Sequence, residues 1–380
     1  MKNTTTFAGW LCVVLFAATG HSRAGIRPSF SLNHSTWHAT DIVVASEGDT
    51  VDGTVSVLEV WKGRLAPGKV LSIPALARFA KKETRTVKPG WIPVPRDDKA
   101  TPVVLSGRRM VLFLKRATPV AAKGKQPEPV RWAPTSLFGG MHVSVVWIER
   151  GKTYSFVQIM NPGPSMLTGG RRSEKEMKKS VSLIMQTQQA LASIAAVADP
   201  RKRARDATKY VRSDDYRARQ AAFGILAGCK TAAVPILRSL LADESNADRY
   251  GGIVDALAVA GGSALGQDFT DRVEKELTFW KARAPSLKVG WWNGTGLEWK
   301  DAVALRNRYS KILHVLYALR KMRHEGARKP VRAFRDYWRS LPQLEGKSGL
   351  SQMSETCDAV LKSLDEAKGS SNKRDAGDGR

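Results

Sequence analysis

Residues 213–244 read SDDYRARQAAFGILAGCKTAAVPILRSLLADE, and this stretch decides the fold of the C-terminal half. In its first part, apolar residues recur at i, i+3, i+4, i+7 and i+8, which is one face of a helix: Ala218, Ala221, Ala222, Ile225 and Leu226. The second part repeats the spacing in Ala233, Ile236, Leu237, Leu240 and Leu241. Two short helices with one apolar face each cannot bury those faces alone, so they need neighbours to stack on.

Four residues are expected to mark the ends of these two helices. Ser213 is the predicted N-cap of the first helix, and Gly228 is predicted to end it, because glycine accepts the left-handed conformation that follows a helix. Thr231 is the predicted cap of the second helix, with Pro235 in or near its first turn, where proline costs least. The stretch predicts an architecture and no reaction.

The totals describe a strongly basic folded protein of about two domains. The chain has 380 residues, of which 42% are hydrophobic and 25% charged, and its formal net charge is +26. Residues 1–170 carry 22 basic and 10 acidic side chains, and residues 171–380 carry 39 and 25, so the excess is +12 and +14. Because the excess is spread over both halves, we do not expect a nucleic-acid partner.

The first 24 residues have the pattern of a secretory signal peptide. Lys2 precedes a mostly apolar run, Phe7 to Ala18, that is too short to span a bilayer comfortably, and Ser22-Arg23-Ala24 is a small-x-small cleavage site. An uncleaved anchor is the alternative. We expect a periplasmic or secreted protein with no transmembrane segment after the signal peptide.

Cleavage would leave two cysteines, Cys229 and Cys357. Export permits a disulfide between them, but two cysteines make no disulfide framework. Two buried thiols in a helical array are the favoured interpretation.

Residues 25–168 are predicted to form a small antiparallel β barrel or sandwich. The continuous apolar run at 110–114 indicates a central strand, and residues 149–152 indicate a hairpin turn. Long basic insertions separate several of the strands. The β-branched and apolar runs between turn signals give six strands, at residues 41–47, 54–61, 70–75, 110–114, 142–148 and 153–159.

Residues 173–367 are predicted to be helical, which makes the chain an α+β protein, and residues 368–380 are predicted to be a disordered tail. A second copy of the first helical unit begins at Tyr250, where Leu257 matches Leu226 at an offset of about thirty residues. The expected helices are 177–198, 201–211, the pair described above, 250–260, 268–284, 305–319, 330–341 and 351–367.

The pattern DYRARQAAFGILA…AAVPILRSLLAD resembles HEAT-like helical repeats, over residues 200–285 and, in a looser form, 300–365. The resemblance implies an α-solenoid that scaffolds protein–protein interactions. Some such families are pigment lyases, but no lyase motif is present. The front region, from DIVVASEG to VQIMNPGPS, resembles the strand-rich N-terminal region of exported bacterial proteins of unassigned function, and an OB-like barrel.

The sequence contains none of the common catalytic motifs. HExxH, GxSxG, the P-loop and GxGxxG are all absent, so no catalytic or cofactor-binding residue is predicted. His34 and His38 are four residues apart, which on a helix would place both imidazoles on one face. The segment is expected to be a solvated loop that leads into the first strand, so no metal ligand is predicted.

Two basic segments and one aromatic loop are the candidate binding residues. A solvated outer face is the alternative for the basic segments, and packing between helices is the favoured role of the tryptophans. The possible anion-binding residues are Arg201, Lys202, Arg203, Arg205, Lys209 and Arg212 in one segment and the stripe Arg332, Arg335 and Arg339 in the other. The possible aromatic contacts, to a ligand such as a sugar, are Trp291, Trp292 and Trp299.

Three functions fit these patterns. The leading expectation is an exported, non-enzymatic scaffold that binds an unknown protein partner on its helical surface. One alternative is a basic cell-envelope protein that binds an anionic polymer. The other is a hydrolase with a site in the loops of the β domain.

Overall fold

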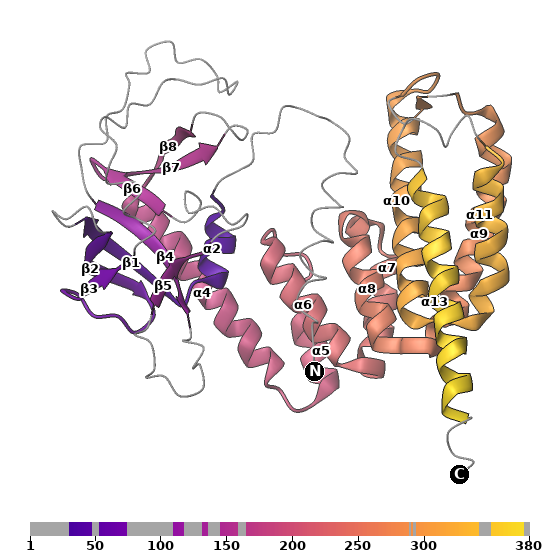
Figure 1. The fold of residues 1–380 in the computed structure, drawn as a ribbon, viewed down its shortest axis with the longest axis horizontal. Helices are drawn as coiled ribbons and strands as arrows, with labels where there is room; N and C mark the ends of the chain where they lie inside the picture. The colour runs from indigo at the N-terminus through magenta and orange to yellow at the C-terminus, as the bar shows by residue number, and fades with distance from the viewer. Residues whose placement is uncertain are drawn as a thin grey trace. The chain divides into compact units, whose positions relative to one another are not determined.

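The computed structural model describes residues 30–47, 53–73, 109–117, 131–135, 145–158, 165–288, 290–291, 294–341 and 351–375 (Figure 1). The chain divides into two compact units, one within residues 21–190 and the other within residues 191–380. None of the helices in the described part combines the length and apolar character needed to cross a membrane. The predicted signal peptide lies outside the described residues.

The N-terminal unit is built on one antiparallel sheet (Figure 1). Its path runs β3-β2-β1-β4-β6-β7-β8, with β5 also paired to β4. In the described strands, β3 and β8 end this path without pairing to each other, so the expected barrel or sandwich is corrected to a single open sheet. The strands are β1 (Asp41–Glu47), β2 (Thr54–Lys62), β3 (Val70–Ser72), β4 (Arg109–Ala117), β5 (Arg131–Pro134), β6 (Val145–Glu149), β7 (Lys152–Gln158) and β8 (Ser165–Ser173).

β4 is the central strand, as its apolar sequence predicts. β1 pairs along one edge of β4, while β6 and β5 share the opposite edge. Met110, Leu112 and Leu114 lie in the core on one face of the sheet, and Val111 and Phe113 lie in the core on the other. A strand that is buried on both faces has no position for a polar side chain, which explains the continuous apolar run.

Two helices, α2 (Leu32–His38) and α4 (Glu174–Ala195), cover one face of the sheet. Met177 and Val181 of α4 share a core with β1, β4 and β6, and Leu32 of α2 packs against it. Residues 32–38 were expected to be a loop, and this expectation is wrong. The segment is helical because Ser31 caps it, its Oγ accepting the N–H of His34 at 3.3 Å, and because packing on the sheet buries one side.

The predicted hairpin joins β6 and β7 through Arg150 and Gly151. Both residues have positive φ, 48° and 72°, which is the type I′ geometry that matches the twist of the strands. Two strands were not predicted. β5 is only four residues long and ends at Pro134, and β8 contains Gly169 and Gly170, which are normally depleted from strands.

After the sheet, the described residues contain nine α-helices (Figure 1). The last of them extends to Asp375, beyond the predicted end at residue 367, and the predicted tail beyond 375 lies outside the described residues. The nine are α4, α5 (Pro200–Thr208), α6 (Tyr216–Gly228), α7 (Val234–Ala242), α8 (Tyr250–Gly261), α9 (Gly266–Arg283), α10 (Trp299–Met322), α11 (Arg328–Arg339) and α13 (Ser351–Asp375).

One arrangement occurs three times in this unit: a helix, a 3₁₀ segment of three or four residues, and a second helix. The three segments are η3 (Lys230–Ala233) between α6 and α7, η5 (Gly262–Leu265) between α8 and α9, and η8 (Glu325–Ala327) between α10 and α11. A longer 3₁₀ segment, η4 (Glu244–Arg249), joins α7 to α8. α8 packs against both α6 and α10, so the three first helices lie side by side (Figure 1). α9 packs against α10 and α11, and α13 packs against α10 and α11 as well.

The ends of α6 and α7 differ in detail from the prediction. Asp215, not Ser213, caps α6, with its side chain accepting the N–H of Arg217. Gly228 does end α6, but the left-handed residue is Lys230, with φ 51°. Thr231 lies inside η3 and caps nothing, because the 3₁₀ turn leads directly into α7. Pro235 sits in the first turn of α7, as expected.

Both cysteines are buried and free. Cys229 is the C-cap residue of α6, and Cys357 lies inside α13. Burial raises the pKa of the Cys357 thiol to about 12, which keeps it protonated at neutral pH. The favoured interpretation, two buried thiols, is confirmed.

Two adjacent glycines allow α8 to approach both of its neighbours closely. A Cβ atom at Gly252 would lie 2.3 Å from the ring of Phe223 on α6, and one at Gly251 would lie 2.5 Å from the imidazole of His314 on α10. Real Cβ atoms essentially never make contacts this short, so a larger residue would force the ring or the helix to move.

Gly252→Ala should therefore destabilise the protein by about 1–3 kcal/mol, the usual cost of overpacking a core. Gly224→Ala is the matched control, because Gly224 also lies inside a helix but has nothing within 4 Å of the added methyl group. That change should stabilise by about 0.5–1 kcal/mol through helix propensity. Urea unfolding of both variants measures the difference; equal effects of the two substitutions would contradict the packing.

His314 predicts a pH dependence of stability. Burial lowers the pKa of its imidazole below the ordinary 6.5, with the charge of Lys321 lowering it further and that of Asp255 opposing this. The unfolded chain therefore takes up the proton first, so this contribution is complete above about pH 6.5 and is lost as the pH falls. Thermal unfolding at about pH 7.5 and about pH 5.5 should show a smaller acid-induced loss in His314→Gln than in the native chain; an unchanged loss would refute this role.

Candidate anion-binding surface

Helix α5 carries the first predicted basic segment. Asp199 caps it by accepting the N–H of Arg201 at 2.9 Å, and Pro200 occupies the first turn. Its buried face consists of Ala204 and Ala207, which pack towards α6. Because only small residues face inward, the long basic side chains of α5 occupy its remaining surface.

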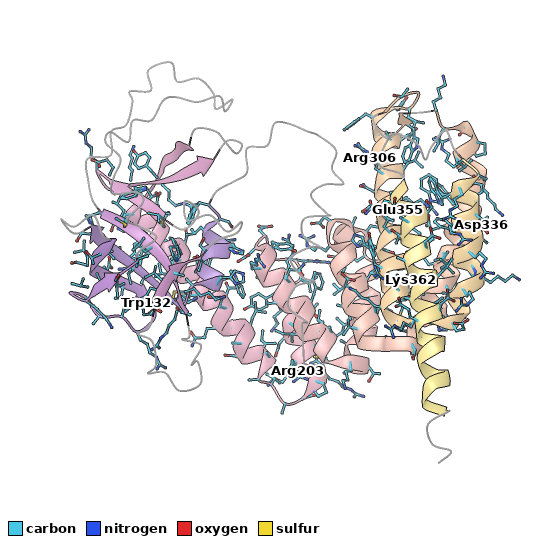
Figure 2. The ribbon with its side chains drawn as sticks, in the orientation of Figure 1. Trp132, Arg203, Arg306, Asp336, Glu355 and Lys362 are labelled. Atoms are coloured by element: carbon cyan, nitrogen blue, oxygen red, sulfur yellow. The ribbon has the colours of Figure 1, made fainter. Side chains whose placement is uncertain are left out.

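Three of the six predicted residues of this segment have partners inside the protein. Arg203 is half-buried and ties the ends of two helices together (Figure 2). Its Nε donates to Cys229 Sγ at 3.3 Å, and its guanidinium donates to the Val197 carbonyl at 3.0 Å. The other two form ion pairs, Lys209 with Asp206 at 3.0 Å and Arg212 with Asp243 at 2.5 Å.

The other three, Arg201, Lys202 and Arg205, are exposed, and no described residue forms a hydrogen bond or ion pair with their side chains. Arg205 follows Arg201 by four residues and Lys202 by three, so all three lie within two turns of one helix. Three cations without a neutralising acid produce a local positive potential that attracts carboxylate or phosphate groups. Of the six predicted residues, these three are the ones whose side chains are available to a ligand.

The second predicted stripe, on α11, is largely neutralised by α13. Asp358 of α13 accepts from Arg335 at 3.2 Å and from Arg339 at 2.6 Å. Only Arg332 of the stripe is exposed without a partner among the described residues. Asp358 is 19 residues beyond Arg339 on another helix, so the spacing along α11 could not reveal the pairing.

The apolar face of α11, formed by Val331, Phe334 and Trp338, is buried, and the aromatic core around it includes one of the three candidate tryptophans. Trp338 is fully buried, with ring centroids 5.3 Å from Trp280 and 5.7 Å from Tyr309. Trp291 is also buried, 6.0 Å from Trp280, so it belongs to this aromatic core. Trp292 lies outside the described residues.

Trp299 differs from the other two because it is 66% exposed at the first residue of α10. The guanidinium of Arg306, labelled in Figure 2, lies 4.7 Å from the centre of its ring. This cation–π contact occupies part of the ring surface. Trp299 is therefore the described tryptophan that stays accessible to a ligand.

The structure offers less support for a metal site or for a catalytic site in the loops of the β domain. In the described part of the chain, no three or more His, Cys, Asp or Glu side chains are grouped to hold a metal ion. The insertions at residues 74–108, 118–130 and 136–144, where a hydrolase site was placed as an alternative, lie outside the described residues. The helix α2 brings His34 and His38 together, with ring centroids 4.3 Å apart, which the expected loop would not have done.

The candidate site is thus the open face of α5, formed by Arg201, Lys202 and Arg205. Such a group of exposed cations can attract anions. No protein-family model, no curated protein and no solved structure matches this chain.

Proposed function

We propose that this chain is an exported, non-enzymatic binding protein whose helical unit is a HEAT-like array that docks an acidic protein partner on α5. The observation that carries the proposal is the contrast between two basic helices. The cations of α11 are mostly paired with acids of this chain, whereas Arg201, Lys202 and Arg205 of α5 have no partner among the described residues.

The repeated helix–3₁₀–helix arrangement supports an array. Ion pairs also connect its successive parts at a near-constant separation: Arg212 with Asp243 is 31 residues apart, and Arg238 with Asp268 is 30. Repeat arrays contact partners through the extended surface that stacking leaves exposed. α5 packs against α6, the first helix of the first unit, so its open face lies at one end of the array.

The distribution of free cations favours an acidic protein over a long anionic polymer. A polymer needs a continuous track of positive charge. The pairing of Arg335 and Arg339 with Asp358 leaves Arg332 as the stripe residue without a partner in the described chain. A compact group of carboxylates on a folded partner matches the three residues of α5, since arginine binds carboxylates bidentately.

Charge reversal on α5 tests the proposed surface. The test variant carries Arg201→Glu, Lys202→Glu and Arg205→Glu; the control carries Arg320→Glu, Lys329→Glu and Arg332→Glu, three exposed cations of α10 and α11. Each variant lowers the formal net charge from +26 by six, to +20, so non-specific attraction changes equally. Binding to poly-glutamate, used as a short peptide that presents a compact group of carboxylates, should weaken at least about tenfold in the test variant and much less in the control.

Binding to heparin, a sulphated polymer, tests the alternative that the protein binds an anionic polymer. If both variants lose affinity for heparin and poly-glutamate to the same extent, binding follows net charge and the α5 surface is not the site. Retention of full poly-glutamate binding by the α5 variant would also overturn the proposal. Circular dichroism establishes that both variants are folded.

Export is part of the proposal and is supported by the sequence of residues 1–24. The expected result is a mature protein that begins at Gly25, read by N-terminal sequencing of the exported chain. A chain that keeps Met1 in the membrane fraction would show that the segment is an uncleaved anchor.

A further inference from the structure

The helix α2 presents two histidines as neighbours. His34 and His38 are one helical turn apart, and their ring centroids are 4.3 Å apart with the ring planes inclined by 47°. His38 is exposed and His34 is half-buried. This arrangement is separate from α5 and does not depend on the proposed function.

α2 is held firmly at both ends, so the two histidines start from a fixed backbone. Ser31 caps its first turn, and Ser35 and Thr36 are buried. At the other end, Lys62 Nζ donates to the Thr36 carbonyl at 2.7 Å, and Gln188 Nε2 donates to the Trp37 carbonyl at 3.0 Å. Binding of a ligand that bridges the two rings therefore costs little conformational entropy, because the backbone between them is already ordered.

The separation of the rings is close to that of a metal chelate. Imidazole nitrogens bind Zn²⁺ at about 2.0–2.1 Å, which places the centroids of two rings on one metal about 5 Å apart. The observed 4.3 Å requires the rings to open by less than about 1 Å, a change that side-chain rotation can supply. Neutral imidazole is also a preferred ligand of late first-row metals.

We propose that His34 and His38 chelate a divalent late first-row metal ion, Zn²⁺ or Cu²⁺. The described residues supply no third His, Cys, Asp or Glu to this pair.

Zinc binding to the full chain, measured by equilibrium dialysis with ZnCl₂, tests the pair. The native protein should bind Zn²⁺ at this site, and His34→Ala and His38→Ala should each weaken it at least about tenfold, a loss that even an outer-shell partner of a metal ligand can cause. Cu²⁺ electron paramagnetic resonance should show two coordinated imidazole nitrogens in the native chain and one in each variant. Metal-free thermal unfolding shows whether the variants remain folded.

Moving one histidine by one position along the helix provides a sharper control. Asn33→His in the His34→Ala background keeps the number of histidines but places them five residues apart, about 140° around the helix. This variant should bind Zn²⁺ as weakly as His34→Ala. Native-like affinity in the shifted variant, or no binding by the native chain, would overturn the proposal.

Discussion

The helical unit depends on how closely α8 approaches the two helices beside it. Gly251 and Gly252 leave room for rings that come from opposite sides, His314 from α10 and Phe223 from α6. The methyl group of an alanine at either position would overlap its ring. Two consecutive residues of one helix point about 100° apart, so a glycine pair can admit two different neighbours at one level. The glycines cost helix propensity but fix the order α6-α8-α10.

This close packing determines which charges remain free. Where helices meet, acids of one helix neutralise cations of the next, as Asp255 does for Lys321 and Asp358 does for Arg339. Each such pair is exposed and contributes little to stability, but it removes a cation from the surface available to a partner. On α5, by contrast, the exposed Arg201, Lys202 and Arg205 pair with no acid in the described part of the chain. The proposed binding surface is thus the helix whose exposed cations pair with no described acid.

Much of the fold follows from the sequence, because periodicity reports burial directly. The apolar run at 110–114 became the central strand, and the predicted helix at 305–319 lies within α10. Its apolar residues Leu305, Tyr309, Ile312, Leu316 and Leu319 are buried. Local signals failed where tertiary contacts decide the structure. β8 contains two glycines and pairs with β7 nevertheless, and residues 32–38 become a helix because the sheet beneath them buries one side. The spacing of the apolar residues did not reveal that a short 3₁₀ segment joins the two helices of each of three pairs.

The sequence predicted which basic residues belong to the candidate site, but not which of them stay unpaired. The sequence identified nine basic residues, yet spacing along one helix cannot report an acid on another. Asp358 forms ion pairs with two residues of the α11 stripe, and Asp243 forms one with Arg212 of the first segment, so these cations are not available to a ligand. The tryptophans also differ in role. Trp291 and Trp338 both pack against Trp280 in a buried aromatic core, while Trp299 is exposed to solvent. Long-range contacts, which a single sequence does not contain, separate structural from available side chains.

Hydrogen–deuterium exchange on the complex with poly-glutamate tests the central claim most directly, because it reads each helix separately in one native chain. The account predicts slower exchange of the amides of α5, residues 200–208, on binding, with α11, residues 328–339, unchanged. Equal protection of both helices, or protection of α11 alone, would contradict it.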